Sequence, residues 1–239
     1  MRKRGATFVA PLFLTKNAMQ KIAVIVAGGI GQRMGASIPK QFLLLNGKPI
    51  LWHTLQRFLM TWDDLRIILV LPAEHQEEGN KIVQTLQASD RVTITTGGDT
   101  RFQSVKNGLS LIKEPAVIFV HDGVRCLLSS ELIKRCFQQT LEKGSAIPAV
   151  AATDSIRIVE GEGHYVADRN LVRIIQTPQT FLSDLLLPAF QQSYQTSFTD
   201  EATVVEAAGK KVFLIEGEYT NIKITRPEDL QMAEQMIQR

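Results

Sequence analysis

Short runs rich in isoleucine, valine and leucine alternate along this chain with longer amphipathic segments. Such alternation predicts an α/β fold with a parallel or mostly parallel sheet. The continuous apolar character of the runs is typical of strands that helices cover on both faces. We expect strands at residues 21–27, 65–71, 92–95, 116–120, 145–150 and 211–215. We expect helices at residues 50–60, 73–88, 101–113, 130–143 and 181–192, and a last helix opened by the capping box Thr225-x-x-Glu228.

One segment, within residues 152–177, interrupts the alternation. Two β-like stretches, residues 155–159 and 164–170, flank the turn sequence Glu160-Gly-Glu-Gly163 and predict a β-hairpin arm that protrudes from the main sheet. A two-stranded hairpin is marginally stable in water, so the arm is expected to pack against another surface. A partner subunit is the simplest choice, and an arm folded back over its own domain is the alternative.

Length and the character of the N-terminus set the expected domain boundaries. The chain has 239 residues, enough for one α/β domain with an embellishment. Residues 1–18 combine a basic start with an apolar stretch, but Pro11 interrupts that stretch and no clear cleavage site precedes Lys21. We therefore expect residues 1–18 to be a disordered leader or the product of an upstream start codon, with export as the less favoured alternative. Residues 19–239 are expected to form a single domain.

Composition excludes several classes of protein. A formal net charge of +3 and the lack of a basic tract after residue 4 argue against nucleic-acid binding. No later apolar stretch approaches the length of a membrane span. The two cysteines, Cys126 and Cys136, suit neither a zinc cluster nor a disulfide framework, which favours the reducing cytoplasm. The four histidines lack metal-ligand spacing, so metal ligands stay unassigned.

The strand at residues 21–27 runs directly into a glycine-rich loop that brings two cations, Arg33 and Lys40. Glycines let the backbone approach a phosphate closely, and successive N–H groups can form an anion-binding nest. The pattern predicts a nucleoside triphosphate site, although Met34 and Pro49 break the dinucleotide and Walker A motifs respectively. A tight turn flanked by two solvated cations is the alternative.

Two further polar groups follow expected strands, where open α/β sheets bind ligands. Gly97-Gly98-Asp99 offers an acid that could contact ribose hydroxyls or a base amino group, unless Asp99 or Thr100 only caps the next helix. His121-Asp122, with Arg125 nearby, offers an acid for a metal, a ribose or a substrate hydroxyl. An Asp–Arg pair that merely orders the loop is the alternative at that position.

Two cations outside these loops complete the candidate set. Arg169 follows the expected hairpin and offers a guanidinium fork that matches phosphate oxygens, and Lys223 ends a β-like run. No Gly-x-Ser-x-Gly elbow or Cys–His pair in the sequence suggests covalent catalysis. Phosphoryl or nucleotidyl transfer needs no protein nucleophile, because positioning and electrostatic stabilisation supply nearly all of the catalysis.

Taken in order, these motifs make the chain resemble the 2-C-methyl-D-erythritol 4-phosphate cytidylyltransferase family of the non-mevalonate isoprenoid pathway. The resemblance spans residues 21–239. Its motifs are residues 27–35 (Ala-Gly-Gly-x-Gly-x-Arg-Met-Gly), Pro39-Lys40-Gln41, Gly97-Gly98-Asp99 with Arg101 and Ser104, His121-Asp122 with Arg125, Asp168-Arg169, residues 176–181 (Gln-Thr-Pro-Gln-x-Phe), residues 199–202 (Thr-Asp-Glu-Ala) and residues 221–230 (Asn-Ile-Lys-x-Thr-Arg-Pro-Glu-Asp-Leu). Gly123-Val124, Cys126 and Ser155 depart from the family's usual residues, while Asp122 and Arg125 keep their spacing.

The resemblance implies a Rossmann-like, three-layer nucleotidyltransferase fold and a homodimer whose arms embrace the opposite subunit. It also implies that, with Mg²⁺, CMP passes from CTP to a polyol phosphate, 2-C-methyl-D-erythritol 4-phosphate, giving 4-diphosphocytidyl-2-C-methyl-D-erythritol and pyrophosphate. Catalysis would fall to Arg33, Lys40 and Lys223. Nucleotide binding would fall to Ala27, Gly28, Gly29, Gly98, Asp99, Ser104 and Asp122. Substrate binding would fall to Asp122, Arg125, Ser155, Arg169, Thr177 and Thr199.

Two alternatives stay open at the level of sequence. Ribitol-5-phosphate cytidylyltransferases perform the same chemistry on a longer polyol, and the residues alone do not separate the two substrates. A non-catalytic nucleotide-binding module on this fold is more distant, because such a module should have lost Arg33, Lys40 or Lys223, and all three are present.

Overall fold

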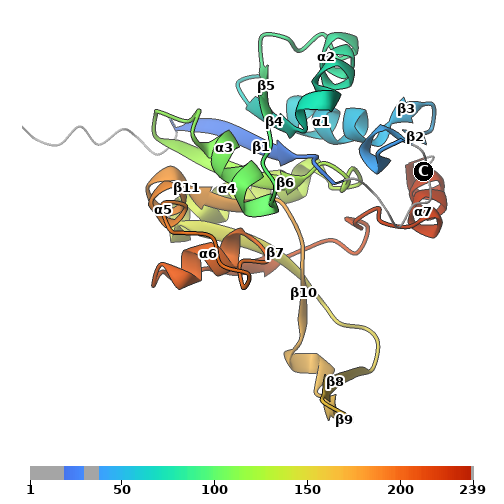
Figure 1. Cartoon of the computed structure of the whole chain (residues 1–239), viewed down its shortest axis with the longest axis vertical. Helices are drawn as coiled ribbons and strands as arrows, with labels where there is room; N and C mark the ends of the chain where they lie inside the picture. Colours follow the sequence, from blue (N-terminus) through green and yellow to red (C-terminus); the bar gives the residue numbers. More distant parts are fainter. Residues whose placement is uncertain (1–18, 30–37, 238–239) are drawn as a thin grey trace, which may run out of the picture.

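A mixed sheet of eight strands forms the centre of the molecule (Figure 1). The computed structural model describes residues 19–29 and 38–237. β1 (Gln20–Val26) pairs in parallel with β4 (Arg66–Leu71) on one side and β6 (Ala116–Asp122) on the other. β5 (Val92–Thr96) adds a further parallel strand beyond β4. The predicted α/β fold with a parallel core is confirmed.

The other half of the sheet contains antiparallel pairs. β11 (Gln179–Leu182) lies between β6 and β7 (Ser145–Ala151) and is antiparallel to both. β10 (Arg173–Ile175) is antiparallel to the far end of β7, and β12 (Leu214–Glu216) is parallel to its middle. β10 and β11 therefore behave as one strand that is interrupted at residues 176–178, beside the end of β6.

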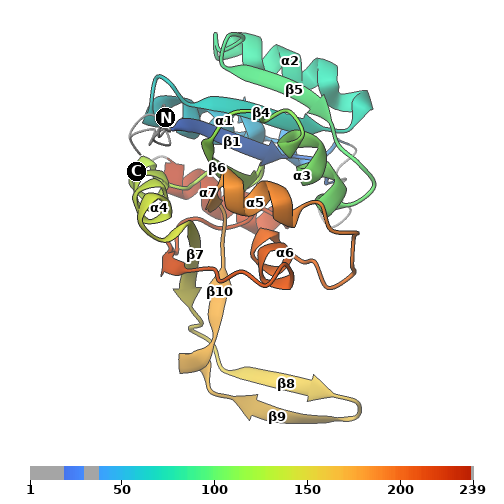
Figure 2. The same cartoon turned by 90° about the vertical axis from the view of Figure 1, so that its left-hand side faces the viewer.

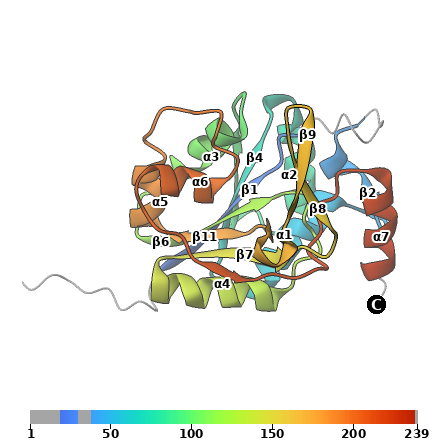
Figure 3. The same ribbon diagram turned by 90° about the horizontal axis from the view of Figure 1, so that it is seen from below.

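Helices cover both faces of the sheet and produce the predicted three layers. α1 (Ile50–Thr61), α2 (Gln76–Thr85) and α4 (Ser130–Lys143) pack on one face. α3 (Arg101–Leu109), α5 (Ser183–Ala189) and α6 (Glu201–Ala207) pack on the other, as Figure 3 shows for α5 and α6 opposite α4. Along β1, Ala23 and Ile25 contribute to the first layer and Ile22 and Val24 to the second, because side chains alternate along a strand.

A smaller core attaches α7 (Pro227–Ile237) to the edge of the domain. It includes Leu45 of the short hairpin formed by β2 (Leu44–Leu45) and β3 (Lys48–Pro49), together with Val124 and Ile224. The Ile224 N–H also donates to the Val124 carbonyl at 3.0 Å. This core therefore fixes the chain just after Lys223 and just after Lys40.

The structure corrects the prediction of a helix at residues 181–192. Gln179–Leu182 is strand β11, and the helix α5 spans only Ser183–Ala189. The position between β6 and β7 buries Phe181 completely and pairs its backbone on both sides, which outweighs the helical pattern. α6 and β10 were not predicted as elements.

Other boundaries also differ from the predictions. The helix expected at 73–88 divides into a 3₁₀ turn, Ala73–His75, and α2, and the helix expected at 101–113 ends at Leu109. The strand expected at 211–215 is Leu214–Glu216. At the start of α7 the carboxylate of Asp229, rather than Glu228, accepts hydrogen bonds from the N–H and hydroxyl of Thr225 at 2.8 and 2.9 Å.

The predicted hairpin arm is present and extends away from the sheet and its helices (Figure 2). It consists of β8 (Ile156–Glu160) and β9 (Gly163–Ala167), which pair with each other and not with the main sheet. Large apolar side chains on and beside the arm are exposed, among them Val159, Val166 and Leu171. The arm is thus not folded back over its own domain.

Several expectations concern the chain as a whole. Within residues 19–29 and 38–237, no helix is long and apolar enough to cross a bilayer. Cys126 and Cys136 are free thiols, and burial raises the pKa of each to about 12. The leader predicted for residues 1–18 lies outside the described residues.

Candidate active site

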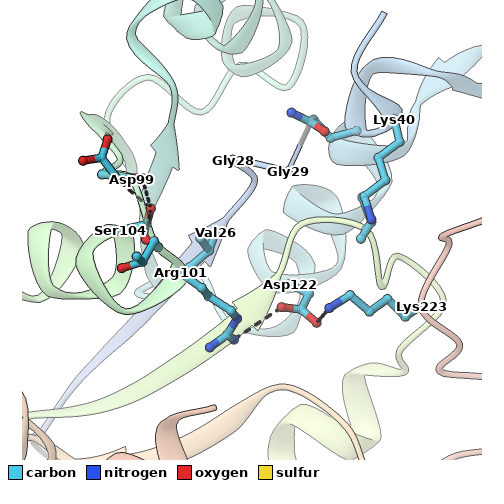
Figure 4. A pocket seen from close by; sticks show the side chains of 13 residues that line it. Val26, Gly28, Gly29, Lys40, Asp99, Arg101, Ser104, Asp122 and Lys223 are labelled. Carbon is cyan, nitrogen blue, oxygen red and sulfur yellow. Dashed lines mark hydrogen bonds and ion pairs between the residues drawn. The ribbon is translucent and has the colours of Figure 1, made fainter. Parts of the chain in front are cut away.

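The loops that follow β1, β5 and β6 enclose one pocket of about 230 Å³ (Figure 4). The loops at the carboxyl ends of strands are the usual ligand site of an open α/β sheet. The parallel pairing of these strands brings together residues that are up to about 195 positions apart in sequence, from Gly28 to Lys223. The predicted site residues that line the pocket are Gly28, Gly29, Lys40, Gly98, Asp99, Ser104, Asp122 and Lys223.

The beginning of the glycine-rich loop forms the first side of the pocket. Ala27 is buried at the end of β1, where its N–H donates to the Val70 carbonyl at 3.0 Å. The Ala27 carbonyl accepts a 2.7 Å hydrogen bond from Nε2 of the buried Gln41, so the N–H and the carbonyl of Ala27 are both hydrogen-bonded. Lys40 extends into the pocket from the 3₁₀ turn Lys40–Phe42 (Figure 4). Arg33, predicted as a catalytic cation, lies outside the described residues.

The loop between β5 and α3 forms the second side. Thr100 caps α3 by accepting the Gln103 N–H at 3.0 Å, and the Ser104 hydroxyl accepts the Gly98 N–H at 3.1 Å. A Cβ on Gly98 would collide with the Gln103 side chain, so only glycine lets the loop turn this close to the helix. Because Thr100 serves as the cap, the exposed Asp99 carboxylate is not used for capping and is available to a ligand.

Asp122, at the end of β6, is the centre of a charge cluster. Lys223 Nζ lies 2.9 Å from Asp122 Oδ2, and Arg125 Nε lies 3.4 Å from the same oxygen. Arg101 Nη2 approaches Oδ1 at 3.3 Å from the opposite side (Figure 4). The Asp–Arg pair considered from the sequence therefore exists, but it is one part of a larger arrangement in which three cations share one carboxylate.

The three cations determine the protonation state of Asp122. Burial by itself would raise the pKa of this carboxyl group, but Arg101, Lys223 and Arg125 hold the pKa of Asp122 well below its usual range. Asp122 is therefore a carboxylate in neutral solution and can accept hydrogen bonds only. A neighbouring polyol hydroxyl could donate to it.

Arg101 and Glu201 are site residues that the sequence prediction did not include. Arg101 lines the pocket, and both terminal nitrogens of its guanidinium bind the carboxylate of Glu201, with Nη2 3.1 Å from Oε2. Glu201 is completely buried, and burial raises its pKa against the opposing effect of Arg101. Both residues stand in quoted motifs, directly after Asp99-Thr100 and Thr199-Asp200, so the signal was present although no role was assigned.

His121 and Thr177 support the backbone of Asp122. His121 Nε2 lies 3.0 Å from the Arg125 carbonyl, which can only accept, so Nε2 carries the proton. Nδ1 of the neutral ring then accepts the Thr177 hydroxyl proton at 3.0 Å, and the Thr177 oxygen accepts the Asp122 N–H at 3.1 Å. Thr177 is buried, and its hydroxyl proton is already used within the protein.

His121 is expected to reduce stability as the solution becomes acidic. Burial lowers its pKa from 6.5 to about 4, so the unfolded chain binds a proton in this range that the folded chain does not. Its contribution is complete above pH 6.5 and is lost as the pH falls towards 4, by about 3 kcal/mol in all. NMR of the ¹⁵N-labelled imidazole should show His121 still neutral at pH 5. Titration of this ring near pH 6.5 would contradict the buried, hydrogen-bonded arrangement.

A glutamine and an asparagine position the segment that carries Lys223. Gln176 donates to the Glu218 carbonyl at 2.7 Å and accepts the Glu218 N–H at 3.1 Å. Asn221 is buried and donates to the Thr177 carbonyl at 2.8 Å, while Arg125 donates to the Asn221 carbonyl at the same distance. Gln179 holds the start of α6 instead. The Gln-Thr-Pro-Gln and Asn-Ile-Lys motifs are thus two halves of one hydrogen-bonded junction.

Of the six predicted substrate-binding residues, Asp122 lines this pocket and the other five do not. Ser155 directly precedes β8 and Arg169 follows β9, at the base of the arm, where Arg169 donates to the Thr153 carbonyl at 2.8 Å. Thr199 is exposed and lines a separate small cavity together with Arg101 and Glu201. Arg125 and Thr177 reach the site only through Asp122.

The described part of the pocket combines cations with few acids. No group of three or more histidine, cysteine, aspartate or glutamate side chains suited to a metal ion occurs among residues 19–29 and 38–237. Lys40 and Lys223 enter from separate segments and point toward the same space (Figure 4). Such a site can neutralise a polyphosphate and hold a second, hydroxylated substrate at Asp122.

The family model that matches the chain describes IspD, 2-C-methyl-D-erythritol 4-phosphate cytidylyltransferase, and it covers residues 21–239. The protein of that name from Bacteroides fragilis is 43% identical over 219 residues, which is 92% of this chain and 100% of that protein. The one from Porphyromonas gingivalis is also 43% identical, over 91% of this chain and 98% of its own length.

Solved structures agree with these relatives. The 4-diphosphocytidyl-2C-methyl-D-erythritol synthase of Anaerococcus prevotii superposes with a TM-score of 0.80 at 27% identity, over 93% of this chain and 98% of that one. The 2-C-methyl-D-erythritol 4-phosphate cytidylyltransferase of Thermus thermophilus superposes with a TM-score of 0.73 at 28% identity, over 92% and 100%.

Proposed function

Because this chain belongs to the 2-C-methyl-D-erythritol 4-phosphate cytidylyltransferase family, and transfers CMP from CTP to that polyol phosphate for isoprenoid synthesis, we propose that the pocket beyond β1, β5 and β6 is its active site. The observation that carries the proposal is the convergence of Lys40, Lys223 and Asp122 on one cavity. The family and the relatives specify methylerythritol phosphate, which decides against the ribitol phosphate alternative and against a non-catalytic module.

The proposed division of roles follows the sides of the pocket. CTP would lie along the first two sides, with its base and ribose against Ala27, Gly28, Gly29, Gly98, Asp99 and Ser104. Its triphosphate would lie between Lys40 and Lys223, with Arg33 as the third cation. The polyol phosphate would bind at Asp122 and Arg125, near Thr177. The closeness of Lys223 to Asp122, 2.9 Å, supports a position for Lys223 between the two substrates.

In the proposed reaction an oxygen of the polyol phosphate attacks the α-phosphorus of CTP in line. The new P–O bond forms as the bond between the α-phosphorus and its bridging oxygen breaks, and pyrophosphate leaves with that electron pair. Negative charge accumulates on the transferring and leaving groups, where Lys40 and Lys223 would stabilise it. No covalent enzyme intermediate is required.

We propose that Mg²⁺ enters with CTP. Mg²⁺ commonly keeps several waters and binds substrate phosphates with one or two carboxylates at most. Among the described residues, the pocket contributes two carboxylates, the exposed Asp99 and Asp122, and the charge of Asp122 is already balanced by three cations, so the pocket does not provide a protein cage. Triphosphate oxygens and water would hold the ion, and the ion would neutralise phosphate charge.

We propose a homodimer in which each arm reaches the partner's active site. The exposed apolar side chains of the arm support this, since Leu171 is 82% and Val159 72% exposed in the single chain. Ser155 and Arg169 lie at the base of the arm, remote from their own pocket, and would complete the polyol phosphate site of the partner, with Thr199 at its rim. We also propose a cytoplasmic location, which the two buried, unpaired thiols support.

Action of Arg169 across the dimer predicts recovery of activity in mixed dimers. Arg169→Ala and Lys223→Ala proteins should each lose most activity alone. When the two are coexpressed, each mixed dimer has one site with both residues intact, so random pairing should restore about a quarter of wild-type activity. Pyrophosphate release by the coexpressed mixture measures this. Activity no higher than that of the separate variants would place Arg169 in its own subunit's site.

The proposed site is tested by pyrophosphate release from CTP, Mg²⁺ and 2-C-methyl-D-erythritol 4-phosphate. D-ribitol 5-phosphate serves as the competing substrate, and EDTA removes the metal. The expected result is turnover of the first substrate alone, abolished by EDTA and by Lys40→Ala. Lys40→Ala protein with normal turnover would show that the chemistry occurs elsewhere.

A further inference from the structure

The pair formed by Arg101 and Glu201 has no role in the reaction as described so far. Glu201 is completely buried at the first position of α6, yet both of its carboxylate oxygens bind the guanidinium of Arg101, which lines the substrate pocket. A buried carboxylate is costly to maintain, and among the described residues the cation that compensates this one is Arg101 of the pocket. That arrangement points to a function beyond the packing of α6.

The structure holds Glu201 in place from both neighbours in the chain. Gln179 of β11 donates to the Asp200 carboxylate at 2.9 Å and accepts the Ala202 N–H at 2.8 Å. Asp200 in turn caps α6 by accepting the Thr203 N–H at 2.9 Å. Glu201 therefore projects from a backbone that is fixed to the strand beside β6, and its position relative to Asp122 is rigid.

Arg101 connects this fixed acid to Asp122. Two of its terminal nitrogens face Glu201, and Nη2 alone also approaches Asp122, at 3.3 Å from Oδ1. A guanidinium that is free to turn prefers to bind a carboxylate with two parallel hydrogen bonds. Glu201 thus takes the two-pronged contact and limits Arg101 to a single, longer contact with Asp122.

We infer that Glu201 is a positioning residue, which acts through Arg101 to keep the Asp122 carboxylate open to the polyol phosphate. The inference rests on the proposed function, in which Asp122 binds a hydroxyl of that substrate. Without the charge of Glu201, Arg101 turns its fork to Asp122 and occupies both oxygens. The substrate hydroxyl and Lys223 then lose their acceptor, whereas the CTP side of the pocket, at Gly28, Gly98 and Asp99, is untouched.

The test is a comparison of the two Michaelis constants in Glu201→Gln. This variant keeps the size of the side chain and one acceptor oxygen. Its KM for 2-C-methyl-D-erythritol 4-phosphate should rise by about tenfold, while its KM for CTP stays within about twofold of wild type, because only the acceptor for the polyol is lost. A purely structural role would instead lower the active fraction and leave both constants unchanged.

The double variant Glu201→Gln/Arg101→Lys provides a second measurement. Lysine keeps the positive charge but has no fork that could cover both oxygens of Asp122, so the KM for the polyol phosphate should return to within about twofold of wild type. Glu206→Gln, an exposed position on the same helix, is the matched control and should behave as wild type.

Each outcome decides a separate question. Suppose that wild type and Glu206→Gln turn over methylerythritol phosphate, but that Glu201→Gln changes both KM values by the same factor or leaves both unchanged. The role of Glu201 is then refuted and the proposed function stands. If wild type itself fails to turn over this substrate, the proposed function fails first. A rise in the KM for the polyol phosphate without a rise in the KM for CTP supports the positioning role of Glu201.

Discussion

Lys223→Ala is expected to lower kcat by about 100- to 1,000-fold, which is the usual cost of removing one group that stabilises developing charge in a water-excluded site. Lys223 reaches the pocket from the segment after β12, and its Nζ lies 2.9 Å from Asp122. In the proposed reaction it stands between the attacking phosphate and the triphosphate. Its charge is therefore most valuable in the transition state, when the charges of both substrates are closest.

Steady-state kinetics with both substrates varied measure this effect. Lys223 is 42% exposed and contributes little to the core, so the variant should unfold at nearly the wild-type temperature. Lys211→Ala, at an exposed position before β12, is the matched control. If the kcat of Lys223→Ala stays within about threefold of wild type, Lys223 only pairs with Asp122 and has no role in the chemical step.

Asp122→Asn is expected to reduce both stability and activity. The variant leaves the cations Arg101, Arg125 and Lys223 around a neutral amide, and breaking a buried ion pair in this way costs about 3 kcal/mol. Of the three cations, the partly exposed Lys223 contributes least to this loss of stability, because water screens its charge. Activity should fall in parallel, since the amide cannot orient both Lys223 and the polyol hydroxyl.

The pH dependence identifies the origin of this loss. The pKa of Asp122 lies well below its usual range in the folded chain, so its stabilisation is complete above the ordinary aspartate pKa of about 3.9 and is lost as the pH falls. The difference in unfolding free energy between wild type and Asp122→Asn should therefore be full at pH 7 and narrow below about pH 4. Urea unfolding at both pH values measures it.

Asp64→Asn is the matched control for Asp122→Asn. Asp64 forms an exposed ion pair with Lys21 at 2.6 Å, so its replacement should cost less than about 1 kcal/mol. The account of a buried cluster stabilised by charge would be contradicted by either of two results. One is an equal loss of unfolding free energy in the two variants, and the other is a loss in Asp122→Asn that does not change with pH.

Local sequence pattern was a good guide to the first half of the chain. The apolar runs that became β4, β5 and β6 follow the helices α1, α2 and α3, so their parallel arrangement with β1 and the edge where the strands end followed from simple rules. The same reasoning found three residues of the pocket. Asp122 stands at the end of β6, Asp99 follows β5, and Lys40 follows the glycine-rich loop after β1.

The second half was harder to predict because its elements depend on distant partners. Residues 179–182 have a pattern compatible with a helix, and only the gap between β6 and β7 makes them a strand. α6 begins at Glu201, whose burial is tolerated only because Arg101, 100 positions earlier, binds its carboxylate. No local window contains both members of such a pair.

The sequence by itself determined the family, the α/β class, the hairpin arm and most of the residues that line the pocket, because these depend on local periodicity and on motifs in order. Only the tertiary structure decided how the charges are shared. It showed that Asp122 pairs with three cations, that the Thr177 hydroxyl donates a hydrogen bond to His121, and that Glu201 binds Arg101. Such assignments depend on distances of a few ångströms between side chains from different strands, and those distances exist only once the sheet has formed.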